Sequence, residues 1–377
     1  MLQQPPLWFI LVAFICAIGP LVFIHEMGHY LVAKRFRVGA EVFSIGFGRE
    51  IVGWTDRSGT RWKVGWLPLG GFVRFVGDMN PASAPAAGAP DVPAELRSRS
   101  FHYKPVWQRF LIVLAGPMAN FLLAILIFAA FFAILGFPRT PPVVTSIAPG
   151  SAAQQVGLAP GDRIVSVDGR ATASFEELAQ YVTLRPDEEV RIEFVRDGQR
   201  SGVTARLARQ VESDRFGQKF EIGRLGVFAA GREYVRLPPL ELIPAATAYT
   251  VRLTRSMIDG LWQIISGRRT VKDLGGPLKI AQIAGQQASL GAFEFIQLLA
   301  LFSINLGFIN LLPVPMLDGG HLFFYAVEAV RRRPVSLRVQ DWAFRGGLAL
   351  LLALLLFTTV NDLDSFGLWH RLERLIG

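Results

Sequence analysis

The sequence has 377 residues, enough for two or three domains, and 51% of them are hydrophobic. This share predicts a few membrane-spanning helices together with a part that lies in water. A single cysteine, Cys16, excludes a disulfide framework and a cysteine-based zinc site within the chain. The net charge of +9 fits Lys and Arg flanking membrane spans, because no basic stretch is interleaved with aromatic residues as in nucleic-acid-binding modules. We therefore expect the lipid bilayer as a partner and no nucleic acid.

The first apolar run covers residues 7–33 and is long enough to span a bilayer as a helix. Lys34, Arg35 and Arg37 follow it at once. A cleaved signal peptide carries its positive charge before the apolar run, so this run predicts a retained span. The positive-inside rule places the N-terminus outside and residues 34–109 in the cytoplasm.

An H-E-x-x-H pattern, His25-Glu26-Met27-Gly28-His29, falls towards the cytoplasmic end of this run. On a helix His25 and His29 leave the same face, so both imidazoles can hold one Zn²⁺. Glu26 is the residue that in metalloproteases takes a proton from water at the metal. A chance match is the alternative, but the chain has only five His, and ionisable residues within a membrane are functional by default. The pattern predicts a catalytic zinc site.

Residues 34–109 carry twice as many Lys and Arg as Asp and Glu, as a cytoplasmic loop should. Its first half predicts β-strands, and the last of them contains Gly70, Gly71, Phe72, Val73 and Arg74. The edge of such a strand beside a protease site could pair with an extended substrate. An ordinary hairpin packed on the helices explains the pattern equally well. Residues 81–93 are rich in Pro and Ala and predict a mobile linker.

The second apolar run, residues 110–137, contains Gly116-Pro117-Met118-Ala119-Asn120. Its small residues permit close approach of another helix. Asn120 within the membrane needs a hydrogen-bond partner, and we expect it to be structural rather than catalytic.

Residues 141–209 change to a water-soluble α+β pattern, in which Ser174 and Glu177 predict a helix-capping box and Asp197-Gly198 predicts a hairpin turn. The stretch S-A-A-Q-Q-V-G-L-A-P-G-D-R-I-V-S-V-D-G within them resembles a PDZ domain of the bacterial protease type. PDZ domains receive a peptide as an added strand. One copy is visible, and the alternation of spans places it on the outer face.

The remaining chain predicts a linker over residues 210–291 and two more spans, over 292–312 and 343–360. Within the linker, residues 242–265 are amphipathic and could form a helix on the outer membrane surface. Three arginines at positions 331–333 place the end of the third span in the cytoplasm, on the same side as the two histidines.

A catalytic zinc needs a third protein ligand besides the two histidines and an open position for water. The candidates are Glu41, Glu50, Asp318 and His321. Asp318 fits best, because it lies beside a span at matching depth and its Pro and Gly neighbours can unwind the backbone. The alternative is that Asp318 merely caps the helix that starts at Gly319. His321 is expected to be structural or to support a ligand.

Together these motifs resemble the site-two protease family, with its bacterial regulator-of-sigma-E protease branch as the best match. The resemblance rests on H-E-M-G-H in the first span, G-P-M-A-N in the second, the PDZ domain, and N-L-L-P-V-P-M-L-D-G-G-H at the third, and it covers nearly the whole chain. It implies an α-helical polytopic membrane protein of about four transmembrane helices. A membrane-associated, β-rich cytoplasmic loop and one inserted α+β PDZ domain complete the implied fold.

The resemblance also implies an intramembrane zinc endopeptidase of the bacterial inner membrane, acting in regulated intramembrane proteolysis and the stress response. Its substrates would be single-span membrane proteins, such as anti-sigma-factor-like proteins or remnant signal peptides, already cut on the outer side by an upstream protease. By the family's pattern His25, His29 and Asp318 hold Zn²⁺, with Glu26 as the base. The expected substrate contacts are Asn310, Asn305, Gly70, Gly71, Phe72, Val73 and Arg74. The active site would lie towards the cytoplasm and the PDZ domain in the periplasm.

Two features depart from the family's best-known branch: one PDZ domain stands where that branch has a tandem pair, and Pro20 lies inside the first span. Two other functions remain open. The chain could be a membrane PDZ adaptor with a structural metal site, but such a site does not need Glu26. It could also be a metal-ion carrier, but intramembrane charge is scarce beyond this one site.

Overall fold

The computed structural model describes residues 5–77, 94–213, 219–229, 231, 233–267 and 275–365. The predicted linker at residues 81–93 lies outside them. The chain divides into two compact units. The first comprises Met1–Phe128, Ala246–Thr254 and Leu274–Asp362, and the second Ala129–Ala245, Arg255–Asp273 and Leu363–Gly377.

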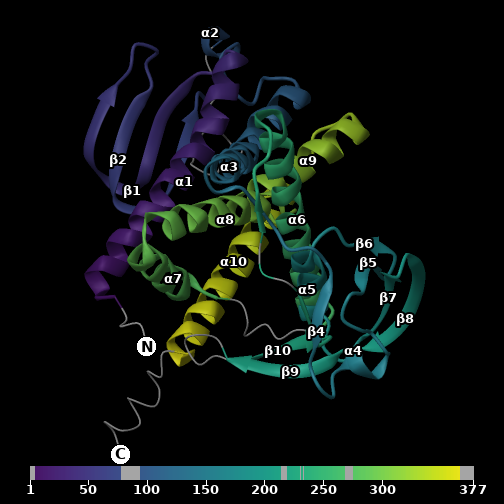
Figure 1. Ribbon diagram of the computed structural model, residues 1–377. Coiled ribbons are helices and arrows are strands. Elements are labelled where there is room, and N and C mark those ends of the chain that lie inside the picture. Colours follow the sequence, from purple (N-terminus) through teal and green to yellow (C-terminus); the bar gives the residue numbers. More distant parts are fainter. Residues whose placement is uncertain are drawn as a thin grey trace, which may run out of the picture. The chain divides into compact units, whose positions relative to one another are not determined.

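Four helices among the described residues are long and apolar enough to cross a membrane. They are α1 (Leu7–Arg35), α3 (Val106–Leu135), α8 (Ala292–Leu311) and α10 (Leu337–Ser365) (Figure 1). Each coincides with one of the four predicted spans, and α1 continues as one helix through Pro20. Many large apolar side chains of α1 and α10 are exposed in the described part of the chain, as a lipid-facing helix requires.

A long antiparallel hairpin, β1 (Ala40–Thr55) and β2 (Arg61–Phe75), lies beside α1 (Figure 1). Its strands bend back, so that Phe43 pairs with Trp62 on one side and with Val73 on the other. Gly46 bends the first strand at a φ of +84°, a left-handed conformation that suits glycine. The stretch from residue 71 to 75 pairs only with β1 and is therefore an edge of this sheet.

The hairpin packs on the membrane helices through one apolar cluster that contains Tyr30, Phe43, Phe75, Phe101 and Ile112. Three further helices complete the first unit: α2 (Ala94–Arg97), α7 (Pro277–Leu290) and α9 (Asp318–Arg331). Part of α6 (Pro239–Ile265) belongs to each unit. The sequence predicts the amphipathic character of α6 but gives no prediction for α7, which packs on α1 through Ala17 and Ala284.

The second unit contains all the other strands among the described residues. They are β3 (Phe137–Arg139), β4 (Val144–Ile147), β5 (Arg163–Val167), β6 (Arg170–Ala171), β7 (Glu189–Arg196), β8 (Gln199–Arg206), β9 (Ala208–Ser213), β10 (Lys219–Arg224), β11 (Val227–Ala229) and β12 (Glu233–Val235). Strands β6, β5, β7 and β8 form a four-stranded sheet in that order, and two helices, α4 (Ala152–Gln155) and α5 (Phe175–Thr183), belong to the same unit.

Two short-range features of this unit, a helix cap and a hairpin turn, are as the sequence predicts. Ser174 accepts a hydrogen bond from the N–H of Glu177 at the start of α5. Asp197 and Gly198 both have positive φ between β7 and β8, as the predicted two-residue hairpin turn requires. The packed unit nevertheless extends beyond residue 209, because β11 pairs with β4 and Leu225 joins the core. The predicted linker over 210–291 therefore includes part of this unit.

Asp162 is a fully buried carboxylate in this unit and accepts hydrogen bonds from Arg196 and from the N–H of Ala159. Burial alone would raise the pKa of Asp162, but these hydrogen bonds outweigh burial and hold the pKa below its ordinary value. Asp162→Asn should lower the free energy of unfolding of this unit by about 1–3 kcal/mol at pH 7. The stabilisation by Asp162 is present above its unfolded pKa, near 3.9, and is lost as pH falls through the lower folded value.

Pulse proteolysis of the full chain in urea measures the free energy of unfolding of this unit at pH 7 and at pH 3.5. The matched control is Asp197→Asn, an exposed turn position where Asn tolerates the left-handed backbone. Equal resistance of Asp162→Asn and the wild-type chain at pH 7 would show that the buried Asp162 carboxylate and its hydrogen bonds do not stabilise the unit.

Candidate metal centre

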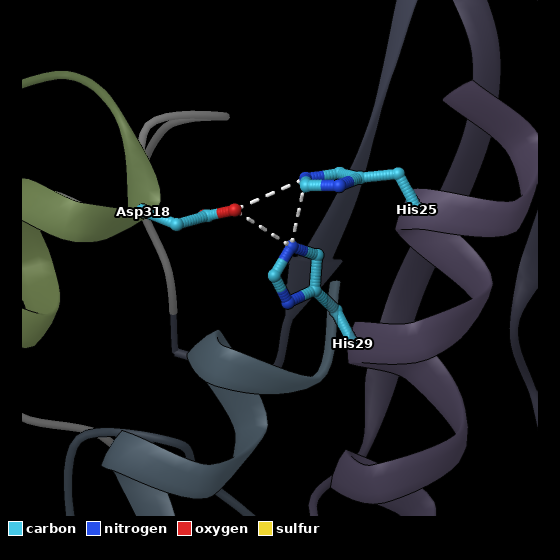
Figure 2. Close-up of side chains that lie close together, drawn as sticks. All are labelled: His25, His29 and Asp318. Carbon is cyan, nitrogen blue, oxygen red and sulfur yellow. Dashed lines mark hydrogen bonds and ion pairs between the residues drawn. The ribbon is translucent and has the colours of Figure 1, made fainter. Parts of the chain in front are cut away.

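Three potential ligand atoms meet in the first unit, two from α1 and one from the first residue of α9 (Figure 2). The Oδ2 of Asp318 lies 3.0 Å from the Nε2 of His25 and 3.5 Å from the Nε2 of His29. The two Nε2 atoms lie 3.3 Å apart. Among the described residues this is the one group of His, Cys, Asp and Glu whose geometry could hold a metal ion.

The four-residue spacing of the histidines on α1 places both imidazoles on one helix face, as the sequence predicts. Asp318 reaches them because the chain turns tightly just before α9. A Cβ on Gly319 would lie 2.2 Å from the carbonyl oxygen of Leu312, so only glycine fits there. The helix-capping alternative for Asp318 fails, since α9 begins at Asp318 itself and its N-cap is Leu317.

An ion pair between α3 and α9 fixes the helix that carries Asp318. The Nη2 of Arg109 lies 2.7 Å from the Oε1 of Glu328, and both side chains are largely buried. The same guanidinium lies over the ring of Tyr325, also on α9. These contacts restrict α9 relative to α3 and thereby the position of its first residue.

One face of α3 supports both imidazoles. The Nδ1 of His29 donates a hydrogen bond of 2.9 Å to the backbone carbonyl of Ile112, which leaves its Nε2 free to bind a metal. Gly116, one turn on, lies directly against the same ring, since a Cβ there would be 2.2 Å from its Nε2. Asn120, a further turn on, reaches His25, with 3.3 Å between its Nδ2 and the Nδ1 of that ring.

The donor set fits zinc by two observations. A tetrahedral zinc with bonds of about 2.05 Å places its ligand atoms about 3.3 Å apart, and the three separations here scatter around that value. The Oδ2 of Asp318 is also buried with no hydrogen-bond donor among the residues that the structure describes. The lone pairs of this oxygen and of the Nε2 atoms of two neutral imidazoles repel one another unless a cation lies between them. Imidazole and carboxylate are both common zinc ligands.

A cavity of about 290 Å³ adjoins these three residues. Its lining includes Glu26 and five of the predicted substrate contacts, namely Gly70, Gly71, Phe72, Val73 and Asn310. The backbone N–H of Val73 donates a hydrogen bond to the Glu26 carboxylate. The geometry thus places an acid–base group, an extended edge and three potential metal ligands around one space.

The other predicted positions are not among the three clustered ligand residues. Arg74 and Asn305 do not line the cavity, and Arg74 instead pairs with Glu41 at 3.0 Å. Glu50, another candidate for the third ligand, pairs with Arg61. His321 lines the cavity but is not one of the three clustered ligand residues. The sequence analysis missed Ile112 and the contact of Gly116 with His29.

Known proteins match most of this chain in sequence. The pattern of peptidase family M50 matches residues 13–354. A protein of Rhizobium meliloti, named as a zinc metalloprotease, is 44% identical over 91% of this chain and 93% of its own length. One of Agrobacterium fabrum with a similar name is 40% identical over 94% and 96%, and the metalloprotease MmpA of Caulobacter vibrioides is 37% identical over the same shares.

Among solved structures, the PDZ domain of an SdrC-like protein from Listeria monocytogenes is 20% identical, with a TM-score of 0.19. It covers 26% of this chain and 92% of its own, and a TM-score this low carries no argument. The match of the family pattern and the long alignments with the relatives are sufficient by themselves to assign the family. The chain belongs to peptidase family M50, the site-two proteases that its motifs resemble.

Proposed function

We propose that this zinc metallopeptidase cleaves the transmembrane segments of single-span membrane proteins, with zinc held by His25, His29 and Asp318. One observation carries the proposal: three buried ligand atoms converge at a cavity that is also lined by Glu26, and one of these atoms has no hydrogen-bond donor among the described residues. Neither a membrane adaptor nor a metal-ion carrier needs Glu26 there, and membership of a peptidase family argues against both.

The depth of the site supports cleavage within the membrane. His25 and His29 lie ten and six residues before the end of α1 at Arg35, which corresponds to about 15 and 9 Å along the helix. Lys34 and Arg35 at that end favour the cytoplasmic side. In this topology the site lies towards the cytoplasm, the N-terminus is outside, and the PDZ-like second unit lies in the periplasm of an inner-membrane protein.

The edge of β2 supports the substrate's path to the site. A peptide bond within a helix is shielded, so the substrate must unwind locally before it can react. The stretch from Gly71 to Phe75 pairs with β1 on one side only and lines the cavity at Gly71, Phe72 and Val73. An unwound substrate segment can pair with that edge as an added strand. Asn310 lines the same cavity and can hold the segment by its side-chain amide.

Zinc held by His25, His29 and Asp318 would supply Lewis-acid polarisation of a carbonyl. Glu26 accepts the proton of the attacking water on its carboxylate and returns it to the amine of the departing fragment. The N–H of Val73 holds that carboxylate at the cavity throughout. The apolar helices around the site limit the access of bulk water.

A cleavage assay with the full chain in liposomes tests the proposal. The substrate is a single-span protein in two forms, one with an intact outer domain and one already shortened on that side. We expect cleavage within the span of the shortened form, loss of cleavage with a zinc chelator, and recovery when zinc is restored. The intact form should be cleaved more slowly. Cleavage that persists in the metal-free protein would contradict the proposal.

A further inference from the structure

Asn120 on α3 is fully buried beside the metal centre, and only one of the two polar atoms of its amide has a neighbour at hydrogen-bond distance. Its Nδ2 lies 3.3 Å from the Nδ1 of His25, while its Oδ1 is buried without a hydrogen-bond partner among the described residues. Its backbone carbonyl accepts a 2.7 Å hydrogen bond from Ser303 on α8. The residue is therefore held in place from a second helix, with its amide directed at His25.

The chemistry of His25 determines which end of this amide belongs at the ring. The Nε2 of His25 faces Asp318 and the second histidine, so in the metal-bound form its lone pair is on that nitrogen. A neutral imidazole then carries its proton on Nδ1, which is a hydrogen-bond donor. The amide nitrogen of Asn120 is also a donor, and two donors do not bond to each other.

A half-turn of the amide about its Cβ–Cγ bond removes the conflict between the two donors, because the oxygen and the NH₂ group have nearly the same size and exchange places. Oδ1 then accepts from the Nδ1–H of His25, and the NH₂ group takes the former place of the oxygen. We propose that Asn120 is a positioning residue for the metal centre, whose Oδ1 fixes the tautomer and the orientation of His25. This inference rests on the proposed zinc site.

The two histidines then have equivalent supports from one helix face. The carbonyl of Ile112 accepts from the Nδ1–H of His29, and the side chain of Asn120 two turns later accepts from that of His25. Such supporting hydrogen bonds typically change metal affinity 10- to 100-fold. An amide provides the acceptor without adding a negative charge beside Asp318 and Glu26.

Two substitutions separate this role from simple packing. Asn120→Leu keeps the branching at Cγ but is bulkier and has no acceptor, and it should weaken zinc binding about 10- to 100-fold. Asn120→Asp can only accept at the ring when ionised, and it should stay within about fivefold of the wild-type affinity. The control is Gln282→Leu, which removes a buried amide on α7 in the same unit and should leave zinc binding unchanged.

The readout is the zinc dissociation constant of the full chain in detergent, measured by competition with a chelator of known affinity. Wild-type chain that binds no zinc would overturn the proposed function itself. With zinc bound by the wild type, Asn120→Leu within threefold of its affinity would overturn only the inference. A loss in Asn120→Asp as large as in Asn120→Leu would also overturn it, because a packing or donor role would then be required.

If Asn120→Leu fails to fold, the other substitution still decides between acceptor and donor. A donor role at the ring would make Asn120→Asp lose more than tenfold in affinity, since two lone pairs would face each other. Nitrogen NMR of the zinc-loaded wild type, labelled only at its five histidines, needs no variant. A proton on Nδ1 of His25 that exchanges slowly with water supports the inference, and a proton on its Nε2 overturns it.

Discussion

Glu26→Gln is expected to lower the cleavage rate by about 10²- to 10⁴-fold while one zinc stays bound, because the general base is lost and the three ligands are untouched. Glutamine has the same length as glutamate, and its amide oxygen can still accept the N–H of Val73. The cavity should therefore keep its shape. Parallel measurements of the cleavage rate and of zinc per chain check this expectation.

The control for this substitution is Glu294→Gln in the first turn of α8, which makes the same chemical change away from the cavity. It should cleave at the wild-type rate. Cleavage by Glu26→Gln at the wild-type rate would show that another group moves the proton. Loss of zinc from Glu26→Gln would instead show that this carboxylate supports the metal.

Gly116→Ala is expected to weaken zinc binding strongly and to lower the cleavage rate with it, although it adds a single methyl group. That methyl would lie 2.2 Å from the Nε2 and 2.4 Å from the Cε1 of His29, far inside van der Waals contact. The ring would have to turn away, which breaks its hydrogen bond to Ile112 and removes its nitrogen from the ligand set. We expect zinc affinity to fall by at least about 100-fold, the upper range for disturbed ligand support.

The control is Gly346→Ala in α10, where an added methyl meets nothing within 4 Å and alanine favours a helix. Its zinc affinity, cleavage rate and thermal stability should match or exceed those of the wild type. If Gly116→Ala binds zinc as the wild type does, α3 does not support His29 as described.

The main elements of the site could be predicted because each leaves a local signal. Hydropathy marks the spans, the four-residue spacing marks His25 and His29, and the Pro–Gly surroundings mark Asp318 as an unusual turn. The support from α3 leaves no such signal. Every residue has a backbone carbonyl, so nothing distinguishes Ile112, and Gly116 matches a general helix-packing motif equally well.

Helix periodicity separates the two asparagines that were predicted to contact the substrate. Asn305 and Asn310 are five residues apart, about 140° around a helix, so one cavity cannot readily face both. The structure places Asn310 at the cavity and leaves Asn305 away from it. Arg74 also does not line the cavity, although Phe72 and Val73 before it both do, and its guanidinium pairs with Glu41 instead.

The extent of the second unit could not be predicted from local pattern either. The partner of β4 is β11, and Ile147 pairs with Val227 across a long stretch of intervening chain. A three-residue strand gives almost no periodic signal by itself. Its place in the fold depends on tertiary pairing, which the sequence does not display.

The most direct test of the account is the zinc content of the purified full chain, compared with that of the double variant His25→Ala/His29→Ala. The account predicts one zinc per chain in the wild type and none in the double variant, with both proteins still folded as judged by their helical content. Stoichiometric zinc in the double variant, or a wild-type chain that binds no zinc when it is supplied, would contradict the central claim that these residues form the metal centre.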